Sequence, residues 1–495
     1  MTGAVMIVGA SSGAGKSTVS AALCRAWARQ HRDVVPFKAQ NLSNHAAVTA
    51  DGGEVGRAQA LQARAAGVEV DRRMNPVLLK PAPEARAHLV VLGQEVMGSD
   101  ARGQGLTAAE LRPVVLQALT ELRTEHDWVV LEGAGAAAEI NLLDRDMVNL
   151  PLAAAAGVPA VLVVDIDRGG GFASAYGTIA LLPERLRHCL VGLVFNRFRG
   201  DPALLDRGIA ELALWTGVPV LGVLPHLGEE PMLGVEDSLD LGAAFESSRQ
   251  CGPAPVRVAV VRLPHLANPS DIDPLVLEPD VVLRWATHPR DLVEADLVIL
   301  PGSRATAEDL AWLRRQGLAE ALRTTSASVL GLCGGYQMLG TWIEDEVESG
   351  LGVLEGLGLL DVRTVFAEPK VVQRSAGRGE GRTIAGYEIR WGRPCVGADP
   401  WLEVDGEAEG AQSTDRRVRG TSLHGLLDND DFRAALLSEI AEARGRQYTP
   451  TPTAYQDAVE AHLDRLADWL TAHVDLARLT TLASDAVTVG WEPGW

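Results

Sequence analysis

Short runs of apolar residues recur along the first half of the chain, separated by longer stretches with a helical pattern. Because these runs are continuous rather than alternating and contain many β-branched residues, they are typical of strands in a parallel sheet covered on both faces. The pattern therefore predicts a doubly wound α/β domain. Its expected strands are AVMIVG (4–9), WVVLEG (128–133), AVLVVD (160–165), LVGLVFN (190–196) and VPVLGVLP (218–225).

A second series of apolar runs follows, with VRVAVV at 256–261, ADLVILPG at 295–302 and SVLGL at 328–332. Between the two series lies FESSRQCGPAP at 245–255, which mixes polar, glycine and proline residues without a period. We therefore predict two α/β domains, both doubly wound with mostly parallel sheets. The expected boundaries are 1–250 for the first domain, 251–440 for the second and 441–495 for a helical C-terminal tail.

Composition narrows the class of partner. The chain has 495 residues, of which 47% are hydrophobic, so it can form two or three cores. Its 65 acidic and 45 basic residues give a net charge of −20, which argues against nucleic acid or an anionic membrane as the main partner. The most apolar stretch, at 150–164, is too short to span a bilayer and is broken by Gly157 and Pro159. We expect no membrane insertion, and self-association stays open.

The cysteines favour a cytoplasmic location. Five scattered cysteines include no C-x-x-C pair, so the sequence predicts neither a disulfide framework nor a zinc site. Free thiols of this kind are usual in a reducing compartment. The N-terminus also has no signal-peptide pattern.

The stretch VGASSGAGKSTVSAAL, at 8–23, has the order strand, glycine-rich turn and helix that a phosphate-binding loop needs. In such a loop, backbone N–H groups and the helix N-terminus hold phosphates, the lysine neutralises them, and the hydroxyl reaches Mg²⁺. Ala10 stands where the common pattern has glycine, so the loop is of a longer type; a glycine-rich turn with an accidental lysine is the alternative. The expected ATP-binding residues in the loop are Gly13, Gly15, Lys16, Ser17 and Thr18.

Polar side chains follow several of the predicted strands. Because the carboxyl ends of parallel strands meet at one edge of a sheet, we expect these side chains to form a single crevice. Carboxylates there suit Mg²⁺, and amides and cations suit an anionic substrate. A solvated loop is the alternative for each residue taken singly. We expect Lys38, Gln40, Asn41 and Asp146 at the substrate, Ser17, Glu132 and Asp51 at the metal, and Asn196 at adenine.

In the second domain, SVLGLCGGYQMLG at 328–340 places Cys333 between an apolar strand and a helix, in a turn flanked by glycines. This is the pattern of a nucleophile elbow, and a helix N-terminus lowers the pKa of a thiol. His424, in GTSLHGLLDN, is the expected base. The N–H groups of Gly302 and Gly334 are expected to form an oxyanion hole. A buried core cysteine and a structural histidine are the alternatives.

Several blocks together resemble the cobyric acid synthase family, from about residue 3 to about residue 435. They are KAQNLSNHAAVTADGGEVGRAQALQA, MNPVLLKP, EGAGAAAEINLLDRDMVNL, DIDRGGGFASAYGT and FNRFRGD. The resemblance implies a first domain related to dethiobiotin synthetase, which uses ATP and Mg²⁺ to phosphorylate a corrin carboxylate that ammonia then converts to an amide. In this family the b, d, e and g carboxylates of adenosylcobyrinic acid a,c-diamide are amidated in turn.

The second domain resembles the class I glutamine amidotransferases, which implies that L-glutamine supplies the ammonia. Many of those enzymes follow their histidine with H-x-E, whereas here Gly425 and Leu426 follow His424. We therefore expect a Cys-His dyad without a third acid, with Asp428 as a weak substitute. Arg390 also stands where related sequences usually have histidine.

Two other functions are weighed against this one. A cobyrinic acid a,c-diamide synthase shares the two-domain plan, but the blocks around residues 40–59 and 141–150 favour the cobyric enzyme. An ATP switch of the partitioning type, with an inactive second domain, leaves the elbow around Cys333 without a role.

Overall fold

The computed structural model describes residues 3–82, 86–96, 106–228, 254–396 and 399–485. The first domain contains a six-stranded parallel sheet in the order β12-β11-β10-β1-β9-β2. Later strands lie on both sides of β1, so the sheet is doubly wound, as predicted. Its strands are β1 (Gly3–Gly9), β2 (Val34–Phe37), β9 (Trp128–Glu132), β10 (Ala160–Asp165), β11 (Leu190–Phe198) and β12 (Val220–Pro225).

Helices cover both faces of this sheet, which explains the continuous apolar runs. Along β1, Met6 and Val8 face one core, whereas Val5 and Ile7 face the other. Successive side chains of a strand point to opposite faces, so each residue must be apolar when both faces are covered. The helices of this region are α1 (Lys16–Arg29), α2 (Arg57–Ala66), α3 (Ala108–Glu125), α4 (Leu150–Ala156), α5 (Gly171–Leu181), α6 (Glu184–Arg187) and α7 (Asp206–Thr216), with 3-10 turns η1 (Arg72–Met74) and η2 (Pro202–Leu205).

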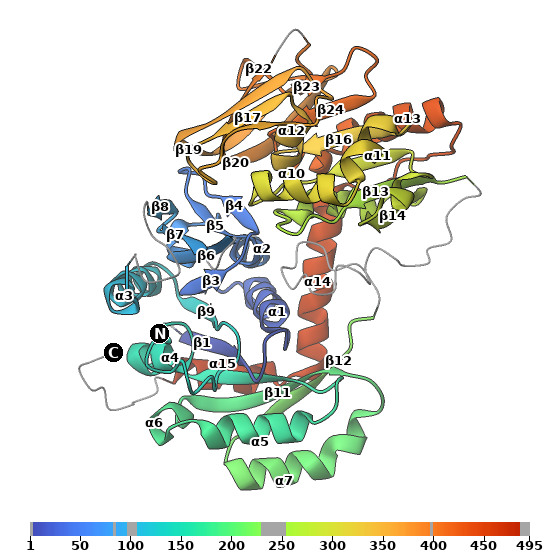
Figure 1. The fold of residues 1–495 in the computed structure, drawn as a ribbon. Helices are drawn as coiled ribbons and strands as arrows, with labels where there is room; N and C mark the ends of the chain where they lie inside the picture. Colours follow the sequence, from blue (N-terminus) through green and yellow to red (C-terminus); the bar gives the residue numbers. More distant parts are fainter. Residues whose placement is uncertain (1–2, 83–85, 97–105, 229–253, 397–398, 486–495) are drawn as a thin grey trace.

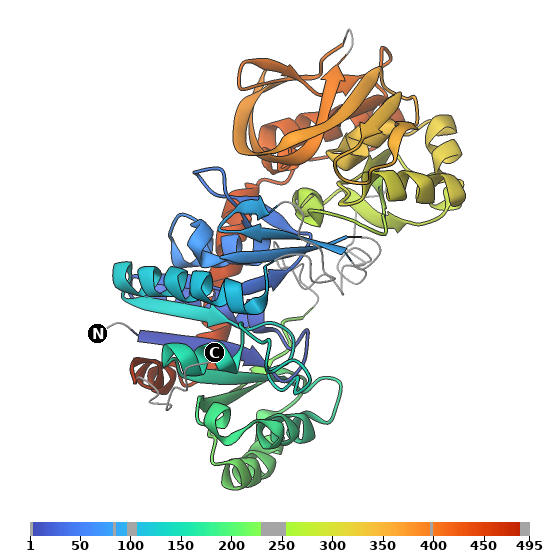
Figure 2. The same ribbon diagram turned by 60° about the vertical axis from the view of Figure 1, so that its left-hand side comes forward.

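The segment after β2 contributes the strands of two small sheets between the central sheet and the second domain (Figure 1). One has the order β3-β6-β7-β8, and the other is the hairpin β4-β5. Both views place these strands toward the second domain (Figure 2). Their bounds are β3 (Gln40–Leu42), β4 (Ala46–Val48), β5 (Glu54–Gly56), β6 (Val77–Ala82), β7 (Arg86–Val91) and β8 (Gln94–Val96).

The second domain has its own central sheet, in the order β14-β13-β15-β16-β24-β23, with all pairs parallel except β23 with β24. The predicted fold class is therefore confirmed for both domains. The strands are β13 (Val256–Val261), β14 (Val281–Ala286), β15 (Leu297–Leu300), β16 (Ser328–Leu332), β23 (Ala411–Gln412) and β24 (Val418–Thr421). The helices are α9 (Asp273–Val276), α10 (Thr306–Arg315), α11 (Leu318–Thr324), α12 (Gly334–Leu339) and α13 (Asp430–Arg444), with 3-10 turns η4 (Pro269–Ile272), η5 (Pro289–Leu292) and η6 (Leu426–Asp428).

A further, largely antiparallel sheet of this domain did not emerge from the sequence. Its main part is the long hairpin of β19 (Val362–Gly379) and β20 (Arg382–Val396). This hairpin reaches the first domain, where Arg374 Nε donates to the carbonyl of Val48 at 3.0 Å. The remaining strands are β17 (Trp342–Asp345), β18 (Gly352–Glu355), β21 (Leu402–Val404) and β22 (Glu407–Glu409).

The C-terminal segment returns to the first domain through α14 (Tyr455–His473) and α15 (Leu476–Ser484) (Figure 1). Leu463 of α14 shares a core with Trp27 of α1. Arg25 Nε also donates to Asp464 at 2.8 Å. Within the described part of the expected tail, α14 and α15 are helical as predicted, and both complete the core of the first domain.

The domain boundary predicted near residue 250 lies outside the described residues. Within the described ranges, no helix is both long and apolar enough to cross a membrane.

Candidate functional site

The phosphate loop connects β1 to α1 at the carboxyl edge of the first sheet. Gly13 and Gly15 have positive φ angles of 70° and 95°, a conformation that favours glycine. Lys16 begins α1, and its Nζ donates to the carbonyl of Gly135 at 2.8 Å. Thr18 is buried on the same helix. The first-turn N–H groups of α1 and the ammonium group of Lys16 thus lie together at a helix N-terminus, which suits phosphates.

Glu132 lies at the end of β9, next to this loop, and is buried. Its Oε1 accepts hydrogen bonds from Ser17 Oγ at 2.9 Å and from Lys38 Nζ at 2.7 Å. Burial raises the pKa of Glu132, but the charge and hydrogen bond of Lys38 outweigh it and hold that pKa below its usual value. The side chain is therefore an ionised carboxylate at neutral pH.

The donor set of Ser17 and Glu132 fits Mg²⁺, which prefers oxygen ligands and is commonly bound by one or two protein groups together with substrate phosphates. Within the described residues, no group of three or more His, Cys, Asp or Glu side chains could hold a metal on its own. A metal here would thus take its remaining ligands from the nucleotide and water.

These residues line a cavity of 680 Å³. Arg145 lines the cavity too, although the sequence did not single it out. Asp146 Oδ1 accepts from the backbone N–H groups of Val148 and Asn149, so this carboxylate also orders the loop before α4. The predicted residues that the structure brings together here are Gly13, Lys16, Ser17, Lys38, Gln40, Asn41, Glu132 and Asp146.

The structure does not bring Asp51 to this cavity. The β4–β5 hairpin carries it away from the phosphate loop, where it pairs with Arg72 and accepts from Thr49. Its side chain is half exposed. The structure therefore does not place Asp51 with Ser17 and Glu132, the other two residues predicted to bind the metal.

Asn196 contacts the phosphate loop itself. It lies behind the phosphate loop, 3% exposed, and donates from Nδ2 to the carbonyl of Ala14 at 2.9 Å. Its Oδ1 accepts from the N–H of Arg197. A Cβ at Gly15 would lie 2.2 Å from Asn196 Nδ2, so glycine is needed there. Asn196 therefore supports the loop, and its contact with adenine stays a prediction.

Cys333 forms a sharp turn between β16 and α12. Its φ of 47° and ψ of −108° are unusual for a residue with a side chain, as at a nucleophile elbow. A Cβ at Gly335 would lie 1.9 Å from the carbonyl oxygen of Leu300, and one at Gly334 would lie 2.8 Å from the nitrogen of Ser303. The glycines therefore let the elbow approach the end of β15.

His424 follows β24 and is held by a carboxylate that the sequence reasoning missed. Its Nδ1 lies 2.7 Å from Asp271 Oδ2, and Asp271 Oδ1 accepts from the N–H of Gly425 at 2.9 Å. Tyr387 stacks on the imidazole ring with centroids 5.1 Å apart. Asp271 and His424 are both almost fully buried. The expectation of a dyad without a third acid is thus wrong in this structure.

Asp428 does not replace that acid. Its Oδ1 has no hydrogen-bond partner among the described residues, and burial raises the pKa of Asp428 to about 7 although the charge of Arg57 opposes this shift. Asp271 lies 153 positions before His424, in the 3-10 turn η4, so no local spacing could have identified it.

The electrostatics of the pair favour a charged imidazole. Burial lowers the pKa of His424, but the neighbouring Asp271 carboxylate and Cys333 sulfur outweigh it and raise that pKa to about 10. An imidazolium beside a sulfur stabilises the thiolate, which is the nucleophilic form.

Cys333, His424, Gly302 and Gly334 line one small cavity of 50 Å³, so the structure brings the four predicted residues together. Arg390 lies in the same wall and donates to Glu388 at 2.6 Å. Lys80 and Asn44 of the first domain complete the cavity. Asn44 also lines the cavity at the phosphate loop, so the two cavities are neighbours across the domain interface.

Both halves of the chain match described protein families. Residues 5–229 match the CobQ/CobB/MinD/ParA nucleotide binding domain, and residues 257–432 match the CobB/CobQ-like glutamine amidotransferase domain.

The chain is also similar to curated relatives over nearly its whole length. It is 47% identical to a cobyric acid synthase of Frankia casuarinae, with 99% of this chain and 98% of the relative covered. The same identity and coverage hold for a cobyric acid synthase of Nocardia farcinica. A cobyric acid synthase of Salmonella enteritidis is 42% identical, with 97% of this chain and 98% of the relative covered.

Proposed function

The chain belongs to the cobyric acid synthase family, and from that premise we propose that it amidates the b, d, e and g carboxylates of adenosylcobyrinic acid a,c-diamide, using ATP and ammonia released from glutamine at Cys333 and His424. The chain is a glutamine-dependent ligase of cobalamin synthesis. One arrangement carries this proposal. A thiol, an imidazole and a carboxylate lie together at one cavity, and Asn44 lines both this cavity and the one at the phosphate loop.

At the second domain, the Cys333 thiolate attacks the side-chain amide carbon of glutamine and forms a γ-glutamyl thioester. His424 gives its proton to the leaving nitrogen, and ammonia departs. Water then attacks the thioester, His424 accepts its proton, and glutamate and the thiolate are regenerated. Asp271 holds the imidazole with Nε2 available for both transfers. The N–H groups of Gly302 and Gly334 would stabilise the oxyanion.

At the first domain, the phosphate loop and Lys16 hold the ATP phosphates, while Ser17 and Glu132 would hold Mg²⁺, which would neutralise charge during in-line transfer. Lys38 donates to Glu132 and lies beside it in the cavity wall, so it can also attract the corrin carboxylate. Gln40, Asn41 and Asp146 line the same cavity and would orient the corrin side chain. The carboxylate is phosphorylated, and ammonia displaces phosphate to form the amide.

Ammonia must pass between the sites without being protonated in bulk water. Asn44 lines both cavities, and its Oδ1 is buried with no hydrogen-bond partner among the described residues. Such an oxygen can accept a hydrogen bond from a passing ammonia molecule. The shared residue supports transfer across the interface and disfavours an ATP switch with an inactive second domain.

The proposal is tested by mass spectrometry of the corrin product after incubation with ATP and glutamine labelled with ¹⁵N at the amide. We expect successive products that contain up to four labelled nitrogens when adenosylcobyrinic acid a,c-diamide is supplied. If the chain left that substrate unlabelled and instead added two labelled nitrogens to cobyrinic acid, it would be identified as the a,c-diamide synthase. ATP turnover without labelled corrin would contradict both.

Replacement of the acid behind His424 gives a separate prediction. We expect Asp271→Asn to lower kcat for glutamine hydrolysis by about 10²- to 10⁴-fold, because the imidazole loses its orientation. Loss of the negative charge also lowers the pKa of His424, since a cation is less stable without its partner. The alkaline limb of the pH profile, where the imidazolium loses its proton, therefore moves toward neutral pH.

The measurement is glutamate release as a function of pH, with ammonium-driven amidation as the check on folding. Asp431→Asn, at an exposed carboxylate of α13, is the matched control and leaves the profile in place. A variant whose rate falls while its pH profile stays unchanged would show that Asp271 acts only on the fold.

A further inference from the structure

Arg304 is a buried guanidinium in the wall of the Cys333 cavity. It follows Gly302 and Ser303 at the end of β15 and is 7% exposed. Its Nη1 pairs with Glu348. Its Nε and Nη2 are buried and have no hydrogen-bond partner among the residues that the structure describes. Unused donors of a buried charge destabilise a protein, so this arrangement indicates a missing acceptor.

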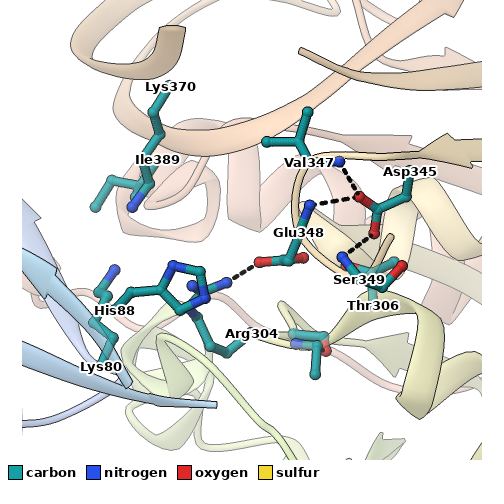
Figure 3. Close-up of polar contacts among 12 residues, drawn as sticks. Lys80, His88, Arg304, Thr306, Asp345, Val347, Glu348, Ser349, Lys370 and Ile389 are labelled. Carbon is teal, nitrogen blue, oxygen red and sulfur yellow. Dashed lines mark hydrogen bonds and ion pairs between the residues drawn. The ribbon is translucent and has the colours of Figure 1, made fainter. Parts of the chain in front are cut away.

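The other cations in this wall are engaged by carboxylates. Lys80 pairs with Glu54, and Arg390 with Glu388. Lys370 pairs with Glu54 at 2.9 Å and has a second carboxylate partner as well. Figure 3 shows the Arg304 guanidinium directed at Glu348, with the His88 ring beside it on the side of Lys80. Of these four cations, Arg304 is the one for which buried donors stay unused in the described structure.

Glu348 is held in place by the turn that carries it. Asp345 at the end of β17 accepts hydrogen bonds from the N–H groups of Val347 at 3.2 Å, Glu348 at 2.7 Å and Ser349 at 3.0 Å (Figure 3). The turn is therefore ordered by one buried carboxylate, and the Glu348 side chain lines the cavity. The cavity thus presents a fixed positive and a fixed negative group close to each other.

This pair matches the two charges of a free amino acid. We propose that Arg304 binds the α-carboxylate of glutamine through Nε and Nη2, and that Glu348 binds its α-ammonium group, while the side-chain amide lies at Cys333. The inference rests on the proposed hydrolysis of glutamine at Cys333. A guanidinium can bind a carboxylate with two parallel hydrogen bonds, which fixes orientation as well as charge.

The size of the cavity supports a site that opens for its ligand. A volume of 50 Å³ has room for only a few water molecules, each of which needs about 10 to 15 Å³. Glutamine therefore enters only if side chains in the wall move. A zwitterion offsets the free-energy cost of this movement, because its carboxylate becomes a partner of Arg304 and its ammonium group a partner of Glu348.

The test compares glutamine with 4-aminobutanamide, an analogue that lacks the α-carboxylate. For Arg304→Gln we expect KM for glutamine to rise about 10- to 100-fold, the value of a charged hydrogen-bond pair, and kcat/KM for the analogue to change little. Arg304→Lys keeps the charge but not the paired donors, so it restores part of the loss. Arg315→Gln, at an exposed position of α10, is the matched control and keeps the KM of the unmodified chain.

Glu348→Gln is tested with 4-carbamoylbutanoate, which lacks the α-ammonium group. We expect this variant to lose affinity for glutamine but not for that analogue. Equal losses for glutamine and the analogues, or a loss of ammonium-driven amidation as well, would overturn the assignment and leave a structural ion pair. Because the readout is glutamate or acid release without corrin, failure of the corrin assignment would leave this result unaffected.

Discussion

Cys333→Ser is expected to abolish amidation driven by glutamine, while amidation driven by added ammonium salt continues. The hydroxyl keeps the size of the elbow side chain but is a far weaker nucleophile than the thiolate beside His424, so glutamine hydrolysis should fall by more than about 10³-fold. The phosphate-loop cavity is lined by other residues and keeps its chemistry. The measurement is the amide content of the corrin, by mass spectrometry, with each nitrogen source at mildly alkaline pH.

The matched control is Cys395→Ser, at an exposed cysteine of β20, which should leave both activities intact. If Cys333→Ser removed the ammonium-driven activity too, the thiol would support the fold or the synthase cavity. If it left glutamine use intact, the nucleophile would lie elsewhere.

Lys16→Gln is expected to have the complementary effect. Amidation should fall by about 10²- to 10³-fold with either nitrogen source, because the phosphates lose the cation that stabilises their developing charge. Glutamate release without corrin should continue, since the cavity around Cys333 contains no part of the phosphate loop. The measurements are corrin amidation, ATP hydrolysis and glutamate release on the same preparation.

Arg207→Gln is the control, because this side chain is 92% exposed on α7 and lines neither of the two cavities. Unchanged amidation in Lys16→Gln would refute the assignment of the loop to ATP. Loss of glutamate release as well would show that the cavity around Cys333 depends on the phosphate loop, although no residue of the loop lines it.

The parts of the molecule that could be predicted from sequence are those encoded in one continuous segment. β1, the phosphate loop and α1 follow each other without interruption, as do β16, Cys333 and α12. In such segments the order of apolar residues and glycines determines both the element and the place of the reactive side chain.

The features that could not be predicted depend on contacts between distant segments. Asp271 reaches His424 only because η4 packs beside the loop after β24, and nothing in its own surroundings marks it as different from other aspartates. Asp51 follows Gln40 closely in the sequence, but the β4–β5 hairpin carries it away from the phosphate-loop cavity. Asn196 donates to the loop carbonyl of Ala14, an approach that the missing Cβ of Gly15 permits.

The β19–β20 hairpin was missed for another reason. Many of the side chains of β19 are partly or fully exposed on both of its faces, so no alternation of apolar and polar residues marks the strand. Val362 and Phe366 at its start pack into the core of the second domain, and pairing with β20 holds the remainder of the strand.

The return of α14 and α15 to the first domain has a consequence for how the chain matures on the ribosome. Trp27 of α1 is fully buried, and its indole N–H donates to Thr480 of α15 at 3.1 Å. Synthesis runs from the N-terminus, so this face of α1 stays uncovered until the entire amidotransferase domain has been translated. The nascent chain thus carries an incomplete first domain for most of its synthesis, with an apolar surface that a chaperone is expected to cover.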